Sequence, residues 1–154
     1  MRTLVCILTL SLVSTTYAGS TVPFHATIDT TPVVVGGSPT TLDLVITGTG
    51  EGGHVGRLEV DGPSHVDLVA ATQTGTSTLT AADGSSFDFS FAGTVGITGP
   101  LPSDPVTFQG TWRVTSGTGR FENVSGGGTY TGSAAGPSGI LFLSGALSNP
   151  GQRN

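Results

Sequence analysis

Residues 106–132 read VTFQGTWRVTSGTGRFENVSGGGTYTG, a stretch that alternates strand-like segments with glycine turns. Apolar side chains stand on one parity in its first segment, at Val106, Phe108, Trp112 and Val114. Successive side chains of a β-strand point to opposite faces, so this spacing places all of them on the same face. The following SGTG (116–119) supplies glycines that accept the positive φ of a tight turn. The stretch therefore predicts antiparallel strands joined by short turns.

The same alternation recurs in the rest of the chain. It is found in three further segments, at Leu42, Leu44 and Ile46, at Phe87, Phe89, Phe91, Val95 and Ile97, and at Leu141, Leu143 and Leu147. Gly93 interrupts the second of these segments and predicts a bend within one long strand. Thr76, Thr78 and Thr80 form a β-branched face ahead of an Asp-Gly turn at 83–84. No segment after the N-terminal apolar run has a helical period.

Glycine and proline positions divide the chain into roughly eight to ten short strands. The predicted breaks are Pro32, Gly36-Gly37, Gly52-Gly53, Asp61-Gly62-Pro63, Gly75, Asp83-Gly84, Gly99-Pro100, Gly117, Gly126 and Gly136-Pro137. The predicted fold is all-β, a single antiparallel β-barrel of about eight strands, with a β-sandwich as the alternative. A closed barrel is favoured because closure removes the exposed edges of a threonine-rich, lysine-free sheet.

The first residues predict export. Arg2 precedes an apolar run at 4–13 and a small-residue ending at Ala18, which is the pattern of a secretory signal peptide. The run is too short for a membrane-spanning helix, which needs about 20 residues. We expect residues 1–18 to be the signal peptide, 19–147 the barrel domain and 148–154 a disordered tail. The mature protein is then secreted or periplasmic, and it contains no cysteine because Cys6 leaves with the signal.

Charge argues against several classes of partner. The formal net charge is −5 and there is no lysine, so nucleic acid and anionic membrane surfaces are poor partners. The chain is also too poor in aromatic residues for the girdles of an outer-membrane barrel, so no membrane insertion is expected.

Motifs for chemistry are weak. GTGEGG (48–53) fits a dinucleotide-binding pattern, but a strand follows it where that site needs a helix. His25, His54 and His65 lie too far apart for a zinc spacing, and no G-x-S-x-G elbow is present. We therefore predict no catalytic residue, no metal and no cofactor, and the chain leans away from an enzyme.

Three segments carry a resemblance to a known group of proteins. GRLEVDG (56–62), TSTLTAADGSSFDFSFAGTV (76–95) and FQGTWRVTSGTGRFENVSGGGTYTG (108–132) resemble repeated elements of small secreted bacterial proteins of the allene oxide cyclase barrel-like, dirigent-like family. The resemblance covers most of residues 42–147 and implies an eight-stranded barrel with an apolar interior, trimeric as in plant members. It carries no active-site residue over, because the matching segments are scaffold elements.

The candidate ligand-binding residues are those expected in the barrel interior or at its rim: Phe87, Phe89, Phe91, Phe108, Trp112, Tyr130 and Arg120. For Arg120 two interpretations stay open, an arginine that pairs with a carboxylate or stacks on an aromatic ring, and an anion contact at the barrel mouth.

Three functions remain in view. They are a barrel that binds a small apolar molecule, a structural or adhesive extracellular domain with a filled core, and a cyclase-like or dirigent-like enzyme or coupling protein. The enzyme ranks last, since likeness at the level of the fold does not establish an activity. An eight-stranded barrel has an interior just wide enough to be packed by side chains or to hold one small ligand, so the state of the interior separates the first two.

Overall fold

The computed structural model describes residues 20–99 and 104–148. The predicted signal peptide and residues 149–154 of the predicted tail lie outside the described residues. Eight strands are present, β1 (Thr21–Ser38), β2 (Thr41–Gly52), β3 (Gly56–Asp67), β4 (Thr72–Ala81), β5 (Ser86–Ile97), β6 (Val106–Gly117), β7 (Ser125–Ala135) and β8 (Ser138–Ser148). A single turn of 3-10 helix, η1 (Gly119–Phe121), lies between β6 and β7. No helix in the described ranges is long and apolar enough to cross a membrane.

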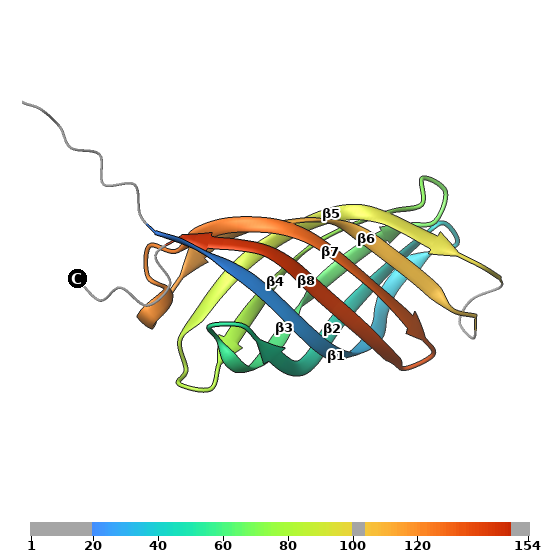
Figure 1. Cartoon of the computed structure of the whole chain (residues 1–154). Coiled ribbons are helices and arrows are strands. Elements are labelled where there is room, and N and C mark those ends of the chain that lie inside the picture. Colours follow the sequence, from blue (N-terminus) through green and yellow to red (C-terminus); the bar gives the residue numbers. More distant parts are fainter. Residues whose placement is uncertain (1–19, 100–103, 149–154) are drawn as a thin grey trace, which may run out of the picture.

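The strands form one closed antiparallel barrel (Figure 1). Each strand pairs with the next along the chain, and β1 closes the barrel by pairing with β8 from Thr21↔Ser148 to Thr30↔Gly139. The predicted all-β barrel of about eight strands is confirmed, and the sandwich alternative is wrong because β1 and β8 meet. Closure leaves no edge strand along this part of the barrel wall. Ser148, which the sequence placed in the tail, is the last residue of β8.

The predicted alternation sets the inward face. In β5, Phe87, Phe89 and Val95 are buried, and β6 turns Trp112 and Val114 inward in the same way. The predicted long strand across Gly93 is confirmed. Leu143 and Leu147 of β8 are also buried, whereas the threonines of β4 alternate with its buried residues and face outward. The exterior is therefore rich in threonine and serine, and the interior is apolar.

Several predicted breaks are wrong, because they fall inside long strands. Pro32 lies within β1, residues 61–63 lie within β3, and Gly75 lies within β4. Pro32 lies beyond Thr30, the last residue of β1 that pairs with β8, so one side of the strand needs no N–H there. Pro63 lies in a gap of the β3–β4 pairing between Asp61↔Thr78 and Ser64↔Gly75. A residue without an N–H is tolerated in a strand where one neighbour is missing.

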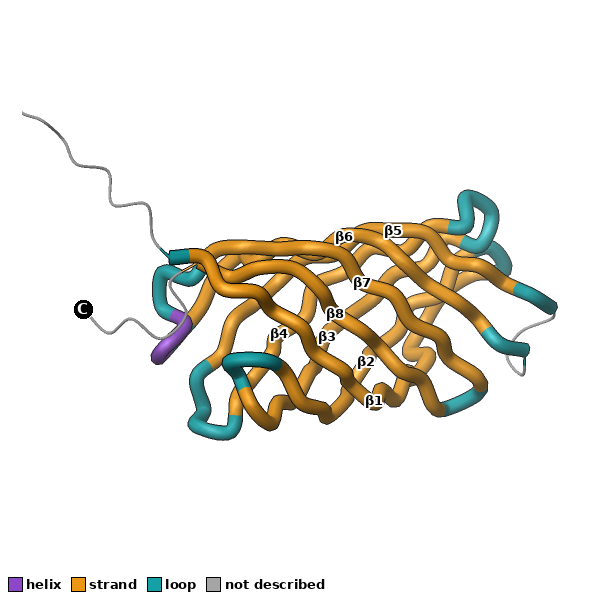
Figure 2. Tube along the Cα trace, viewed as in Figure 1, coloured by secondary structure: helices purple, strands orange, loops and turns teal. Residues whose placement is uncertain are grey.

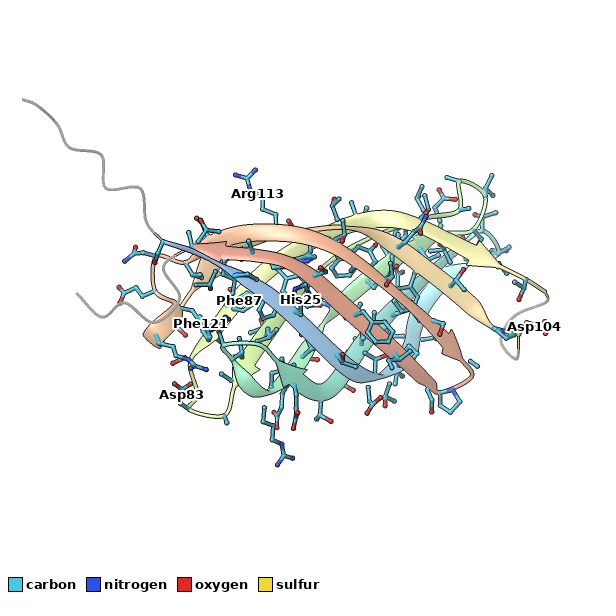
Figure 3. All side chains as sticks on the ribbon, viewed as in Figure 1. His25, Asp83, Phe87, Asp104, Arg113 and Phe121 are labelled. Atoms are coloured by element: carbon cyan, nitrogen blue, oxygen red, sulfur yellow. The ribbon has the colours of Figure 1, made fainter. Side chains whose placement is uncertain are left out.

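The two ends of the barrel differ in their loops. One end carries the connections at 53–55, 82–85 and 118–124, the last of which includes η1 (Figure 2). We call it the closed end, because an aromatic cluster, described below, fills the barrel there. The other end carries the connections at 39–40, 68–71 and 136–137, together with residues 98–99 and 104–105. We call this second end the mouth. Figure 3 shows Asp83 and Phe121 at the closed end and Asp104 at the mouth.

An aromatic cluster fills the barrel toward the closed end. Phe87 is 0% exposed and contacts Phe24 edge-on at 6.0 Å between ring centroids, with Phe121 at 5.4 Å and Trp112 at 6.5 Å. The Trp112 indole N–H donates to the carbonyl oxygen of Thr129 at 3.1 Å, which satisfies its only polar atom. This half of the interior is a packed core.

Candidate functional site

A cavity of about 390 Å³ occupies the other half of the interior. Its volume lies within the range of roughly 300–1,000 Å³ that is usual for small-molecule sites. Its floor includes Phe89, Val60 and Leu143, which belong to the packed core beneath. Its walls rise along β2 through Leu42, Leu44 and Ile46 toward the mouth. The remaining lining residues are mostly aliphatic and aromatic, so the space is an apolar one.

Glycines on neighbouring strands explain why the lumen stays open. Phe91 pairs directly with Gly75 on β4, and a Cβ built at Gly75 would collide with the Phe91 ring. Phe108 pairs with Gly132 on β7, where an added Cβ would likewise collide with the Phe108 ring. These rings therefore lie over the glycines of the adjacent strand, close to the wall. Bulky side chains that lie along the wall leave the centre of the barrel empty.

Tyr130 follows the same wall. It pairs with Gly110 on β6, which pairs with Gly93 on β5, and a Cβ at Gly93 would lie 2.6 Å from the Tyr130 hydroxyl oxygen. Its ring contacts Phe91 at 5.7 Å and Phe108 at 6.4 Å between centroids. Burial raises the pKa of Tyr130 to about 12, so the phenol is neutral at physiological pH. The phenol is then a hydrogen-bond donor as well as an acceptor.

The aromatic residues among the predicted ligand-binding residues fall into two groups. Phe89, Phe91, Phe108 and Tyr130 line the cavity. Phe87 and Trp112 lie in the packed core next to it and contact Phe24 instead. Alternation along a strand shows that all of these face inward, but it does not show at which height the core ends. Whether any of them contacts a ligand stays a prediction.

Arg120 lies at the closed end, opposite the mouth. Its guanidinium carbon sits 4.9 Å from the centroid of the Phe121 ring, and its Nη2 donates to the carbonyl oxygen of Val55 at 2.9 Å. Its Nε lies 3.3 Å from Asp83 Oδ2, an ion pair without hydrogen-bond alignment. Arg120 thus has both features of the structural interpretation. It does not line the cavity, and whether it contacts an anion at its own end of the barrel stays a prediction.

The cavity also contains polar residues that were not among the predicted ligand-binding residues. Gln73 and Ser77 lie on the inward parity of β4 and line the space, while Ser64 of β3 holds the Gln73 side chain. Gln73 Nε2 donates to Ser64 Oγ at 2.9 Å. A signal was present, since the outward threonines at 76, 78 and 80 imply that residues 73 and 77 face the interior. A glutamine on an inward parity marks a polar site in an apolar lumen.

The chemistry available in the cavity is limited to neutral groups and one acid. Of the described residues that line it, Asp104 at the mouth is the only charged one. In the described part of the chain, no group of three or more histidine, cysteine, aspartate or glutamate residues could hold a metal ion. The arrangement is suited to hold an apolar molecule and to form a few neutral hydrogen bonds with it.

Comparison of the chain with models of known families, with curated proteins and with solved structures gives no match. The resemblance to the allene oxide cyclase barrel-like proteins therefore stays a prediction.

Proposed function

We propose that the protein is a non-catalytic binding protein that holds one small apolar molecule in the mouth half of its barrel. The observation that carries this proposal is the apolar cavity of about 390 Å³ above a fully packed half-core. The main alternative is a structural barrel with a filled core. Its interior would be packed along its whole length, whereas this interior is packed by aromatic rings at one end and empty at the other. Burial of the ligand's apolar surface would supply most of the binding free energy.

Exposed apolar side chains at the mouth support this proposal. Val34 is 59% exposed although it lines the cavity, and Val69, in the β3–β4 connection at the same end, is 78% exposed. Ile97, which also lines the cavity, is a third exposed apolar residue at the mouth. Apolar groups that gather at one opening of a soluble barrel mark a place where an apolar molecule enters. The charged residues Arg120 and Asp83 at the closed end are engaged with each other.

Native mass spectrometry of the protein purified gently from its own host is the first test, since a retained small molecule would appear as added mass. The second test is a titration with the neutral apolar dye N-phenylnaphthylamine, which becomes fluorescent in an apolar site. Leu44→Trp places a large side chain in the lumen, and we expect it to weaken dye binding by at least about tenfold. The matched control is Thr47→Trp, on the outer face of the same strand.

Both variants should keep a cooperative thermal transition, which separates loss of the cavity from loss of the fold. A protein that carries no added mass and binds the dye equally well before and after Leu44→Trp would contradict the proposal.

A further inference from the structure

Two buried polar atoms on residues that line the cavity have no hydrogen-bond partner in the described part of the chain. They are Gln73 Oε1 and the Tyr130 hydroxyl oxygen, on residues that are only 6% and 3% exposed. Both residues line the cavity. Buried polar atoms in folded proteins are nearly always paired, because an unpaired one loses its hydration without any return. The pair of atoms therefore points to a bound group that is polar.

The two atoms lie in one row across the barrel wall. Tyr130 of β7 pairs with Gly110 of β6, Gly110 pairs with Gly93 of β5, and Gly93 pairs with Gln73 of β4. The Tyr130 hydroxyl reaches along this row as far as Gly93, to within 2.6 Å of the position of an added Cβ. Directly opposed residues of an antiparallel pair have Cβ positions about 4.5–5.5 Å apart. The hydroxyl thus ends beside the residue that carries the second unpaired atom.

Gln73 is held in place from the other side. Its Nε2 donates to Ser64 Oγ at 2.9 Å, and Ser64 is itself buried on β3. The amide nitrogen is thus engaged, and the amide oxygen is the atom of Gln73 left without a partner. Glycine at 93 is what makes this arrangement fit, because any side chain there would occupy the space that the Tyr130 hydroxyl fills.

Electrostatics exclude a charged group at this point. Among the described residues no lysine, arginine or histidine lines the cavity, so a carboxylate would be buried without a counter-ion. Asp104 at the mouth would also repel an anion as it entered. Gln73 and Tyr130 are both uncharged at physiological pH, so an ammonium group between them would be buried without a carboxylate at its side. The polar group of the ligand must be neutral.

We infer that the cavity selects an uncharged apolar alcohol, bound with its hydroxyl group between Gln73 and Tyr130. This inference rests on the proposed binding function and adds the chemical class of the ligand. A hydroxyl donates one hydrogen bond and accepts others, so it can donate to Gln73 Oε1 and accept from the Tyr130 phenol. It also satisfies the Gln73 amide in either of its two orientations. A ketone, ester or ether only accepts and would leave Gln73 Oε1 unpaired.

The test is competition against N-phenylnaphthylamine with four ligands of matched chain length: decanol, its methyl ether, decanoic acid and decylamine. The protein is the full mature chain, stripped of bound lipid. We expect decanol to displace the dye at a concentration at least about tenfold lower than each of the other three. The methyl ether is the critical comparison, because it differs from decanol only in having lost the donor.

Two variants assign the selectivity to the row. Tyr130→Phe removes one oxygen atom and Gln73→Met removes the amide at nearly constant size, and each should reduce the preference for decanol over its methyl ether to near unity. The matched control is Gln109→Met, which makes the same change on the outer face of β6 and should leave the preference intact. Thermal unfolding confirms that each variant is folded.

The outcomes separate the two proposals. Failure of the dye and of all four ligands to bind would overturn the binding function itself. Dye binding with equal displacement by decanol and its ether, or with decanoic acid or decylamine preferred, would overturn the alcohol inference and leave the binding function standing. Unchanged selectivity in both variants would also overturn it, because the row would then have no part in recognition.

Discussion

Truncation of Phe87 and of Phe108 tests the division of the barrel into a packed half and an open half. Both are inward-facing phenylalanines of adjacent strands, and their sequence surroundings are alike. Phe87 is fully buried among four aromatic rings. Phe108 is half-buried and faces the cavity. The structure therefore predicts different costs for the same chemical change.

Phe87→Ala removes a ring from a packed core and leaves a void, a change that costs about 3–5 kcal/mol in other proteins. Phe108→Ala removes a ring that already borders the cavity. No new void forms, so the cost of a void is not added to the cost of the lost burial. Full burial of such a side chain is worth about 1.5–3 kcal/mol, and half of that, about 0.8–1.5 kcal/mol, is the expected cost at Phe108. The predicted difference between the two variants is at least about 1.5 kcal/mol.

Urea denaturation measures both costs, followed by the fluorescence of Trp112, the only tryptophan of the chain. Since Trp112 is buried and contacts Phe24 in the core, its emission reports global unfolding in each variant. Because Phe87→Ala removes a large part of a typical stability of about 5–15 kcal/mol, Phe87→Leu serves as a milder second variant, with a cost of roughly 1–2 kcal/mol. Equal costs for the two alanine variants, with unchanged denaturant slopes, would refute the asymmetric interior.

Three other perturbations test separate parts of the structure. The pKa of Tyr130 is raised from 10.0 to about 12, so the folded protein holds more protons than the unfolded chain between these values. Stability should therefore be level below about pH 10 and fall as the pH rises toward 12. Denaturation midpoints measured across this alkaline range should not show this fall in Tyr130→Phe. Gly93→Ala should destabilise the protein by about 1–3 kcal/mol in thermal unfolding, because its Cβ would meet the Gln109 backbone and the Tyr130 hydroxyl. The control is Gly36→Ala, whose Cβ has 3.4 Å to its nearest neighbour and should change stability by less than about 0.5 kcal/mol. Similar losses at both positions would contradict the close approach at Gly93. Arg120→Ala should cost about 1–2 kcal/mol of stability, because it removes the stacking on Phe121 and the hydrogen bond to Val55, and it should leave dye affinity unchanged. A large loss of dye affinity in the folded variant would count against a cavity confined to the mouth half.

Much of the fold was readable from local pattern. Period-two spacing assigned the inward faces of β2, β5, β6 and β8, and Asp-Gly and Gly-Pro pairs located several of the turns. Local pattern failed where a glycine or proline had a role inside a strand. Gly75 accommodates the ring of its partner Phe91, and Pro32 uses a side of β1 without a partner. Neither role is visible without the neighbouring strand.

The candidate site was only partly readable. Tyr130 and Phe108 were predicted to face the interior because their parity is a local property, and Gln73 could have been found by the same reasoning. Their meeting could not, because it depends on the register of β4, β5, β6 and β7, which is set by pairings between residues far apart in the sequence. The position of Arg120 likewise depends on which end of the barrel its loop occupies.

The residues alone are enough to identify an antiparallel β protein with an apolar inside and a threonine-rich outside, because side-chain alternation is a property of each strand alone. The tertiary structure alone decided that the barrel closes between β1 and β8, that one half is filled and the other open, and that Gln73 and Tyr130 share one row. These features depend on which side chains reach the same height in the lumen. That is fixed by strand register and by the glycines over which the aromatic rings lie, and both require the whole barrel.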